Sequence, residues 1–170
     1  MEISIRPYHA PDMERVITIW MESSASTDLP TIPLLENNAE KLRFGDRSIS
    51  EVIRKRNILI YVACIGDDIV AFVIFWGDRL DQLFVDPRFQ RRGIGKVLLQ
   101  FAMTIRPQGF WLYAIAANKD ARRFYLREGL QQTGTEIEPE LGIDLVKYEW
   151  RPTAAALPPS SGELPSRTAP

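Results

Sequence analysis

The segment that most constrains the fold is a seven-residue stretch rich in glycine and arginine, Gln90-Arg91-Arg92-Gly93-Ile94-Gly95-Lys96. It lies between an apolar run that predicts a strand, Leu83-Phe84-Val85, and an apolar-periodic stretch, residues 97–105, that predicts a helix. Glycine lets a ligand approach the main chain closely, and the first turn of a helix offers free N–H groups and the positive end of the macrodipole. Because the same stretch carries three cationic side chains, it predicts a site for a phosphate-bearing ligand at a helix N-terminus.

The whole chain has the size and charge of one ordinary soluble domain. It has 170 residues, of which 45% are hydrophobic, and its 21 basic and 22 acidic residues are interspersed rather than blocked. This pattern argues against a dedicated nucleic-acid or membrane-surface binder. No apolar run reaches the roughly 18 residues of a membrane span, and the N-terminus lacks the pattern of a signal peptide. We therefore expect a cytoplasmic protein, either a monomer or a homodimer.

Metal chemistry through histidine or cysteine is nearly excluded by composition. Cys64 is the only cysteine and His9 the only histidine. A metal cluster built on several such ligands, or an intrachain disulfide, therefore has no residues to form it.

Turn residues and hydrophobic periodicity predict a mixed order of strands and helices. A short strand around Ile3 and Ile5 precedes a helix that opens at Pro11; residues 23–37 have the composition of a loop, and residues from about 38 to 56 are mostly helical in composition. The remaining predicted strands are 58–65, 69–76, 79–85, 110–116, 130–137 and 143–150, and the remaining helices are 95–105 and 120–127.

This order mixes hairpins with crossovers and so predicts an α+β fold of α/β/α layers. Its central sheet is expected to be mixed, mostly antiparallel and of about seven strands, with helices on both faces. Residues 1–151 are expected to form a single domain. Residues 152–170 hold five of the 12 prolines and are expected to form a flexible tail.

Spacing separates three kinds of glycine-rich phosphate site. A P-loop has a glycine five positions before its Gly-Lys pair and Ser or Thr after it, but here Gln90 and Val97 occupy these positions around Gly95-Lys96. A dinucleotide-binding loop has a third glycine three residues after Gly95, where Leu98 stands, and lies near the start of a βαβ unit. The spacing therefore disfavours both a P-loop and a dinucleotide-binding loop.

The remaining pattern is Gln/Arg-x-x-Gly-x-Gly/Ala after a strand that ends in Val-x-Pro, and residues 83–95 follow it throughout. A second motif lies downstream, with Asn118, Ala121, Phe124-Tyr125 and Gly129-Leu130 at its positions. Together these motifs resemble the GCN5-related N-acetyltransferase (GNAT) superfamily, closely over residues 79–130 and loosely over residues 2–151.

The resemblance implies that acetyl-CoA binds as co-substrate and that no metal is used. Its pyrophosphate is expected on the glycine-rich loop, and its pantetheine arm in a gap between strand 79–85 and a parallel neighbour, 110–116. Main-chain groups around Phe84 and Val85 are expected to pair with pantetheine, and one N–H to stabilise the oxyanion. The expected cofactor-binding residues are Leu83, Phe84, Val85, Gln90, Arg91, Arg92, Gly93, Ile94, Gly95, Lys96, Asn118 and Tyr125.

The resemblance also gives Tyr125 the role of general acid toward the departing CoA thiolate, and Asn118 that of positioning pantetheine or an ordered water. An amine acceptor is protonated at neutral pH and needs a base. The family often places an ionisable residue at the positions of Arg79 and Asp81, and of these only Asp81 accepts a proton. Two further carboxylates are weaker candidates, Glu22 and Glu36.

We therefore expect an acetyl-CoA-dependent N-acetyltransferase that moves the acetyl group directly to an amine of a small molecule or of a peptide or protein. The alternatives are a non-catalytic acyl-CoA-binding or interaction module of the same fold, and a nucleotide-binding regulatory domain. In this family the first helices and the last hairpin set the acceptor. Here these segments carry mixed charges without a readable pattern, so the acceptor stays open.

Overall fold

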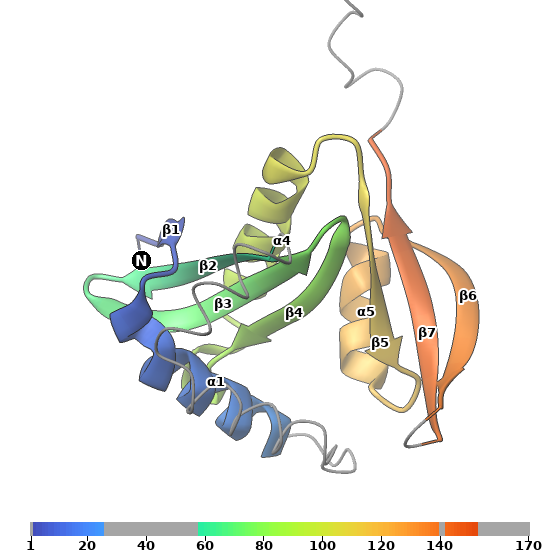
Figure 1. Ribbon diagram of the computed structural model, residues 1–170, viewed down its shortest axis with the longest axis horizontal. Coiled ribbons are helices and arrows are strands. Elements are labelled where there is room, and N and C mark those ends of the chain that lie inside the picture. The colour runs from blue at the N-terminus through green and yellow to red at the C-terminus, as the bar shows by residue number, and fades with distance from the viewer. Residues whose placement is uncertain (1, 26–57, 140–141, 153–170) are drawn as a thin grey trace, which may run out of the picture.

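The computed structural model describes residues 2–25, 58–139 and 142–152, which form seven strands in one sheet with helices on both faces (Figure 1). The strand order is β1-β2-β3-β4-β5-β7-β6, and only the β4–β5 pair among these described strands is parallel. The predicted fold class is confirmed. The elements are β1 (Ser4–Pro7), η1 (Ala10–Asp12), α1 (Met13–Ala25), β2 (Ile58–Ile65), β3 (Asp68–Trp76), β4 (Arg79–Val85), η2 (Pro87–Phe89), α4 (Ile94–Ile105), β5 (Phe110–Ile115), α5 (Lys119–Arg127), β6 (Gln131–Glu138) and β7 (Ile143–Trp150).

The connections decide the strand directions. Strands β2, β3 and β4 are joined by tight turns at Gly66 and Gly77, which both have positive φ angles (+59° and +62°), and such turns permit only antiparallel neighbours. The chain leaves β4 and returns as β5 after crossing the sheet through α4, and a crossover of this kind makes two strands parallel.

Strands β4 and β5 diverge soon after they meet. Over the described residues their register holds a single pair, Arg79 with Trp111, whereas β5 pairs with β7 along its whole length, Phe110–Ile115. Figure 1 shows the two strands separating toward the C-terminal end of β4. The sheet therefore opens into a gap in the middle.

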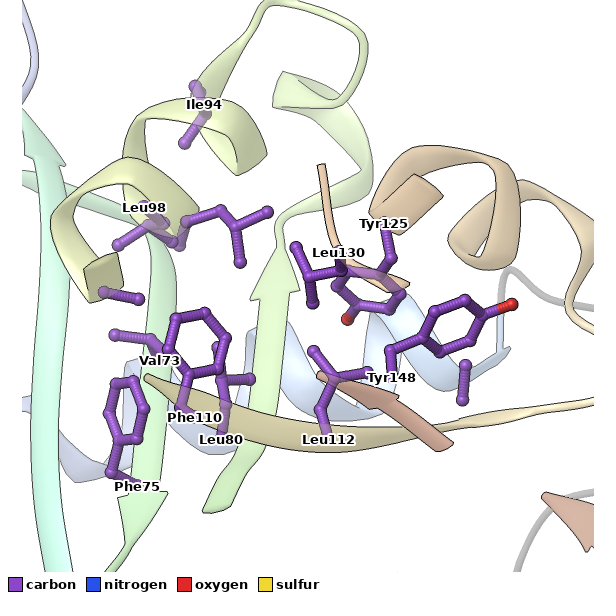
Figure 2. Close-up of a cluster of buried hydrophobic side chains, with 14 of the residues drawn as sticks. Val73, Phe75, Leu80, Ile94, Leu98, Phe110, Leu112, Tyr125, Leu130 and Tyr148 are labelled. Carbon is purple, nitrogen blue, oxygen red and sulfur yellow. The ribbon is translucent and has the colours of Figure 1, made fainter. Parts of the chain in front are cut away.

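The helices bury the two faces of the sheet in separate apolar clusters. On one face α4 and α5 place Leu98 and Tyr125 against Leu112 and Tyr148, all at most 8% exposed (Figure 2). On the other face α1 packs Ile19 and its neighbours against residues of β2 and β3. The ends of α1, α4 and α5 are thereby fixed around the gap.

One predicted boundary is wrong. The serine-rich start of the predicted loop 23–37 continues α1 through Ala25, because the Ser23 hydroxyl finds a partner in the main chain of β4 and its side chain is buried. The rest of that loop, the helical prediction for residues 38–56 and most of the predicted tail lie outside the described residues.

Among the described helices, none combines the length and the apolar character that a membrane crossing requires.

Candidate functional site

A pocket of about 860 Å³ lies where the C-terminal end of β4 meets α1, α4 and α5. This volume is in the upper part of the range of about 300–1,000 Å³ typical of small-molecule sites. Every cofactor-binding residue expected from the sequence lines it except Arg92, whose guanidinium lies 5.3 Å from the centre of the Phe89 ring. The lining is Ser23, Leu83, Phe84, Val85, Phe89, Gln90, Arg91, Gly93, Ile94, Gly95, Lys96, Asn118, Asp120, Ala121, Arg123, Phe124, Tyr125 and Arg127.

The glycine-rich loop turns the free end of α4 into this pocket. Gly93 caps the helix with φ +84°, a conformation that favours glycine, and Arg91 adopts φ +59° although it has a side chain. The first helical hydrogen bond runs from Val97 N–H to Gly93 O at 3.1 Å, so the N–H groups before Val97 precede the helical ladder. The loop therefore presents main-chain donors to an anion.

Gly95 and Ile94 have different functions within the loop. A Cβ added to Gly95 would contact Phe124 at 3.6 Å and Val85 at 3.8 Å, so glycine keeps the space between these two side chains open. The Ile94 side chain is 1% exposed and belongs to the core. Ile94 thus offers the pocket its main chain while its side chain anchors the helix.

The main chain of β4 supplies a second row of polar groups. Asp86 donates its N–H to Val70 O of β3 at 2.9 Å. Because main-chain groups alternate sides along an antiparallel strand, Phe84 also faces β3, while Leu83 and Val85 direct their N–H and C=O groups into the gap beside β5. The sequence resemblance predicts that main-chain groups around Phe84 and Val85 are available to pantetheine. The β3–β4 register indicates that the available groups are those of Leu83 and Val85.

Helix α5 brings Asn118 and Tyr125 to the same pocket. Asn118 caps the helix, with its side-chain oxygen accepting from Ala121 N–H at 3.0 Å. Tyr125 is 8% exposed, and its ring lies against those of Phe124 and Tyr148. Burial raises the pKa of Tyr125 to about 12.

Cationic side chains surround the outer part of the pocket. Lys96 lies 3.5 Å from the carboxylate of Glu128, which also pairs with Arg127 at 3.1 Å. Arg123, one turn before Arg127 on α5, also lines the pocket. Arg123 and Arg127 were not among the residues predicted for the site, although their four-residue spacing on a predicted helix indicates a shared face.

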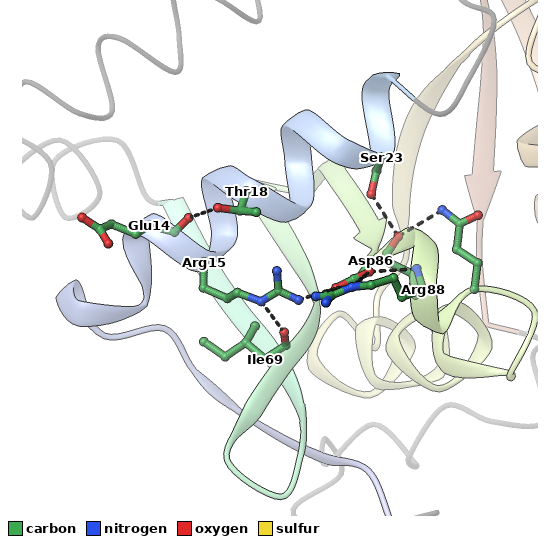
Figure 3. A network of polar contacts seen from close by, with 9 residues as sticks. Glu14, Arg15, Thr18, Ser23, Ile69, Asp86 and Arg88 are labelled. Carbon is green, nitrogen blue, oxygen red and sulfur yellow. Dashed lines mark hydrogen bonds and ion pairs between the residues drawn. The ribbon is translucent and has the colours of Figure 1, made fainter.

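A buried carboxylate fixes the end of β4. The Asp86 side chain is fully buried and pairs with Arg15 of α1 and with Arg88 of η2, the latter at 2.8 Å (Figure 3). Arg15 also donates to Ile69 O at 3.0 Å. Hydrogen bonds from the Arg88 side chain and N–H and from Arg15 hold the pKa of the Asp86 carboxyl well below its usual range.

The predicted base, Asp81, lies at a bulge in β4. The β3–β4 register pairs Ile74 with Gln82 and Phe75 with Leu80, which leaves Asp81 without a cross-strand partner. Its carboxylate forms an ion pair with Arg79 and does not line the pocket.

Aromatic rings and charges gather around that ion pair. The Arg79 guanidinium lies 5.4 Å from the ring centre of Trp76 and 5.7 Å from that of Trp111. The Lys147 ammonium lies 5.0 Å from the Trp111 ring. Tyr113 lies two residues after Trp111 on β5, so both side chains project from the same face of the sheet. A hydrogen bond to Glu136 is the main cause that raises the pKa of Tyr113 to about 12. We call residues 76, 79, 81, 111, 113, 136 and 147 the aromatic face.

Of the two weaker candidates for the base, Glu22 is exposed on α1 and does not line the pocket, and Glu36 lies outside the described residues. Among the described residues, no group of three or more His, Cys, Asp or Glu could hold a metal ion.

Comparisons with known proteins agree with these features. Residues 56–131 match the family described as an acetyltransferase (GNAT) domain. The peptidyl-lysine N-acetyltransferase YjaB of Escherichia coli is 32% identical over 145 residues, which cover 84% of this chain and 91% of that protein. The solution structure of apo-form YjaB from Escherichia coli superposes with a TM-score of 0.71 at 25% identity, covering 88% of this chain and 97% of that one. The PaiA N-acetyltransferase of Thermoplasma acidophilum, crystallised with coenzyme A, shares the fold with a TM-score of 0.69 at 20% identity, over 88% of this chain and 100% of that one.

The buried Asp86 carboxylate predicts a pH-dependent stability. Its folded pKa is depressed, so it stabilises the fold above about pH 4, and this contribution is lost as the pH falls further. We expect Asp86→Asn to lower the free energy of unfolding by about 2–3 kcal/mol at pH 7, because two arginines lose a charged partner. In urea denaturation, the difference in free energy of unfolding between Asp86→Asn and wild type should become smaller below about pH 4. The exposed Asp67→Asn is the control, and an equal loss at pH 3 and pH 7 would contradict the assignment.

Proposed function

The chain belongs to the GNAT acetyltransferase family, and we propose that its acceptor is the side-chain amine of a lysine in a polypeptide. As a family member it is an acetyl-CoA-dependent N-acetyltransferase, as the sequence predicts, and none of the comparisons favours a non-catalytic module. The relative YjaB is named for peptidyl-lysine acetylation, which supports the proposed acceptor class.

The observation that carries this proposal is the ring of Trp111. It already receives two long cationic side chains of the protein itself, Arg79 and Lys147, whose charged groups lie within 5.7 Å of its centre. Aromatic faces attract such cations, and the methylene stem of a lysine covers apolar surface while its ammonium stays polar. A substrate lysine that displaces Lys147 from Trp111 would meet chemistry already suited to it.

Acidic groups on the aromatic face favour the same class of acceptor. Asp81 and Glu136 lie there beside the aromatic rings, and Trp76 is 45% exposed although it is large and apolar. A carboxylate attracts an ammonium, and an exposed tryptophan offers contact area to a polypeptide chain.

For the donor, we propose that the pyrophosphate of acetyl-CoA binds the first-turn N–H groups of α4 and the side chains of Arg91 and Lys96. The pantetheine arm then lies in the β4–β5 gap against Leu83 and Val85. In this position one N–H of that pair donates to the oxyanion that forms when the amine attacks the thioester carbonyl. Main-chain donors suit this task because the sheet fixes them before the reaction.

Tyr125 is the proposed general acid. When the tetrahedral intermediate collapses, the C–S bond breaks and negative charge collects on sulfur, to which the Tyr125 hydroxyl donates its proton. Because burial raises its pKa to about 12, the hydroxyl stays protonated through neutral and mildly alkaline pH.

Asp81 is the proposed base for the incoming ammonium, directly or through water. The bulge frees Asp81 from regular pairing with β3, and the ion pair with Arg79 holds its carboxylate within the aromatic face, where the acceptor is proposed to lie. Arg79 engages one carboxylate oxygen, and the other, which lies 3.5 Å from the Gln82 amide nitrogen, is the oxygen proposed to take the proton.

The acceptor class is tested with a panel of amines and acetyl-CoA, read by mass spectrometry. We expect acetylation at Nε of an internal lysine in a peptide and none of the same peptide with arginine in that position. Trp111→Ala should raise the KM for the peptide about fivefold and leave the KM for acetyl-CoA unchanged, since a cation–π contact is lost. Acetylation of spermidine or of a peptide α-amine in preference to lysine would contradict the proposal.

The two proposed proton carriers are tested by Tyr125→Phe and Asp81→Asn. Each should lower kcat by about 100-fold, the usual size of one acid or base, with little change in the KM for acetyl-CoA. The loss in Asp81→Asn should shrink as the pH rises, because more of the amine is then already neutral. Tyr61→Phe, on β2, is the matched control. Unchanged turnover in either variant removes that residue from the mechanism.

Asn118 combines a structural contact with a proposed ligand contact, and two substitutions separate them. Asn118→Asp keeps the oxygen that caps α5 but loses the amide donor, so it should retain stability and weaken acetyl-CoA binding. Asn118→Ala should lose both, with a cost to stability of about 1 kcal/mol. Thermal unfolding and calorimetric titration measure the two effects. If Asn118→Asp and wild type bind acetyl-CoA with equal affinity, Asn118 caps α5 and makes no contact with the cofactor.

A further inference from the structure

The carbonyl of Val85 accepts hydrogen bonds from two side chains that come from different parts of the chain. Ser23 Oγ, near the end of α1, donates to it at 3.0 Å, and Gln90 Nε2, just before the glycine-rich loop, donates at 3.1 Å. All three residues line the pocket, and Val85 is the last residue of β4. Figure 3 shows the Ser23 hydroxyl reaching from its helix to this carbonyl.

These two donors fill the acceptor capacity of the carbonyl, which has two lone pairs. A pantetheine N–H that donates to Val85 therefore has to displace one of them. The Gln90 contact is exposed, so its amide can turn to water or to a phosphate oxygen. The Ser23 side chain is buried at the end of a helix, so its hydroxyl has less freedom to turn away from the carbonyl than the Gln90 amide has. Gln90 is therefore the donor that leaves, and Ser23 the one that stays.

We propose that Ser23 is a positioning residue of the donor site, which orients the Val85 carbonyl toward a pantetheine amide. This inference rests on the proposed location of the pantetheine arm along β4. It makes α1 part of the acetyl-CoA site, although the glycine-rich loop and β4 supply the groups that touch the cofactor.

The rest of the peptide plane between Val85 and Asp86 is fixed in a compatible way. Its N–H, from Asp86, donates to Val70 O at 2.9 Å, and the Asp86 side chain is paired with Arg15, two turns before Ser23 on the same helix. Helix α1 thus contacts this segment at two points, the Val85 carbonyl through Ser23 and the Asp86 side chain through Arg15. Removing the Ser23 hydroxyl takes away one of the two donors that orient the carbonyl, while Arg15 keeps the helix in place.

The test compares binding of two ligands by isothermal titration calorimetry: acetyl-CoA, and adenosine 3′-phosphate 5′-diphosphate, which carries the pyrophosphate but no pantetheine arm. We expect Ser23→Ala to weaken acetyl-CoA binding about fivefold, the effect of one neutral hydrogen bond, and to leave the nucleotide affinity unchanged. In turnover the KM for acetyl-CoA should rise by the same factor while kcat stays constant.

Two further variants complete the design. Thr18→Ala removes an exposed hydroxyl of α1 that donates to Glu14 O of the same helix, and should match wild type with both ligands. Ser23→Cys keeps a side chain of similar shape but replaces the hydroxyl by a weakly donating thiol. It should therefore weaken acetyl-CoA binding as Ser23→Ala does, and it serves as the test if the alanine variant is poorly folded. Equal weakening of both ligands in the Ser23 variants, or none, overturns the inference. Failure of the wild type to bind acetyl-CoA would instead contradict the proposed function.

Discussion

The divergence of β4 from β5 is the constraint on which the rest of the site depends. A parallel pair with one register contact leaves Leu83 and Val85 with main-chain groups that the sheet does not use. Buried main-chain groups require partners, so an open sheet interior of this kind suits a ligand that carries amides of its own. Helices α4 and α5 then bring a helix N-terminus and a buried tyrosine to the same opening.

The pocket and the aromatic face differ in charge. The pocket carries Arg91, Lys96, Arg123 and Arg127, partly balanced by Asp120 and Glu128, and is suited to a polyanionic cofactor. The aromatic face carries tryptophan rings, and its charged groups, Arg79 and Lys147 with Asp81 and Glu136, are balanced in sign. A cation bound there would therefore be held by the rings and by individual carboxylates rather than by a net negative charge.

Much of this could be predicted from the sequence because it depends on local spacing. The glycine-rich loop, the Asn118 and Tyr125 positions and most strands follow from patterns within a few residues. Features that depend on pairing between distant segments could not be predicted. The bulge at Asp81 follows from the β3–β4 register, and so does the choice of Leu83 and Val85 over Phe84. Ser23 lies in a run of small polar residues typical of a loop, and its helical, buried position comes with a contact to Val85, 62 positions away, that no local pattern predicts.

The most direct test of the account is amide hydrogen exchange measured by NMR on β4, with and without acetyl-CoA. In the free protein the N–H groups of Leu83 and Val85 should exchange faster than that of Phe84, which faces β3. Saturation with acetyl-CoA should slow exchange at Leu83 and Val85 and change Phe84 little. Protection that appears at Phe84 and at neither neighbour would contradict the claim that the main chain of β4 binds the cofactor in the gap.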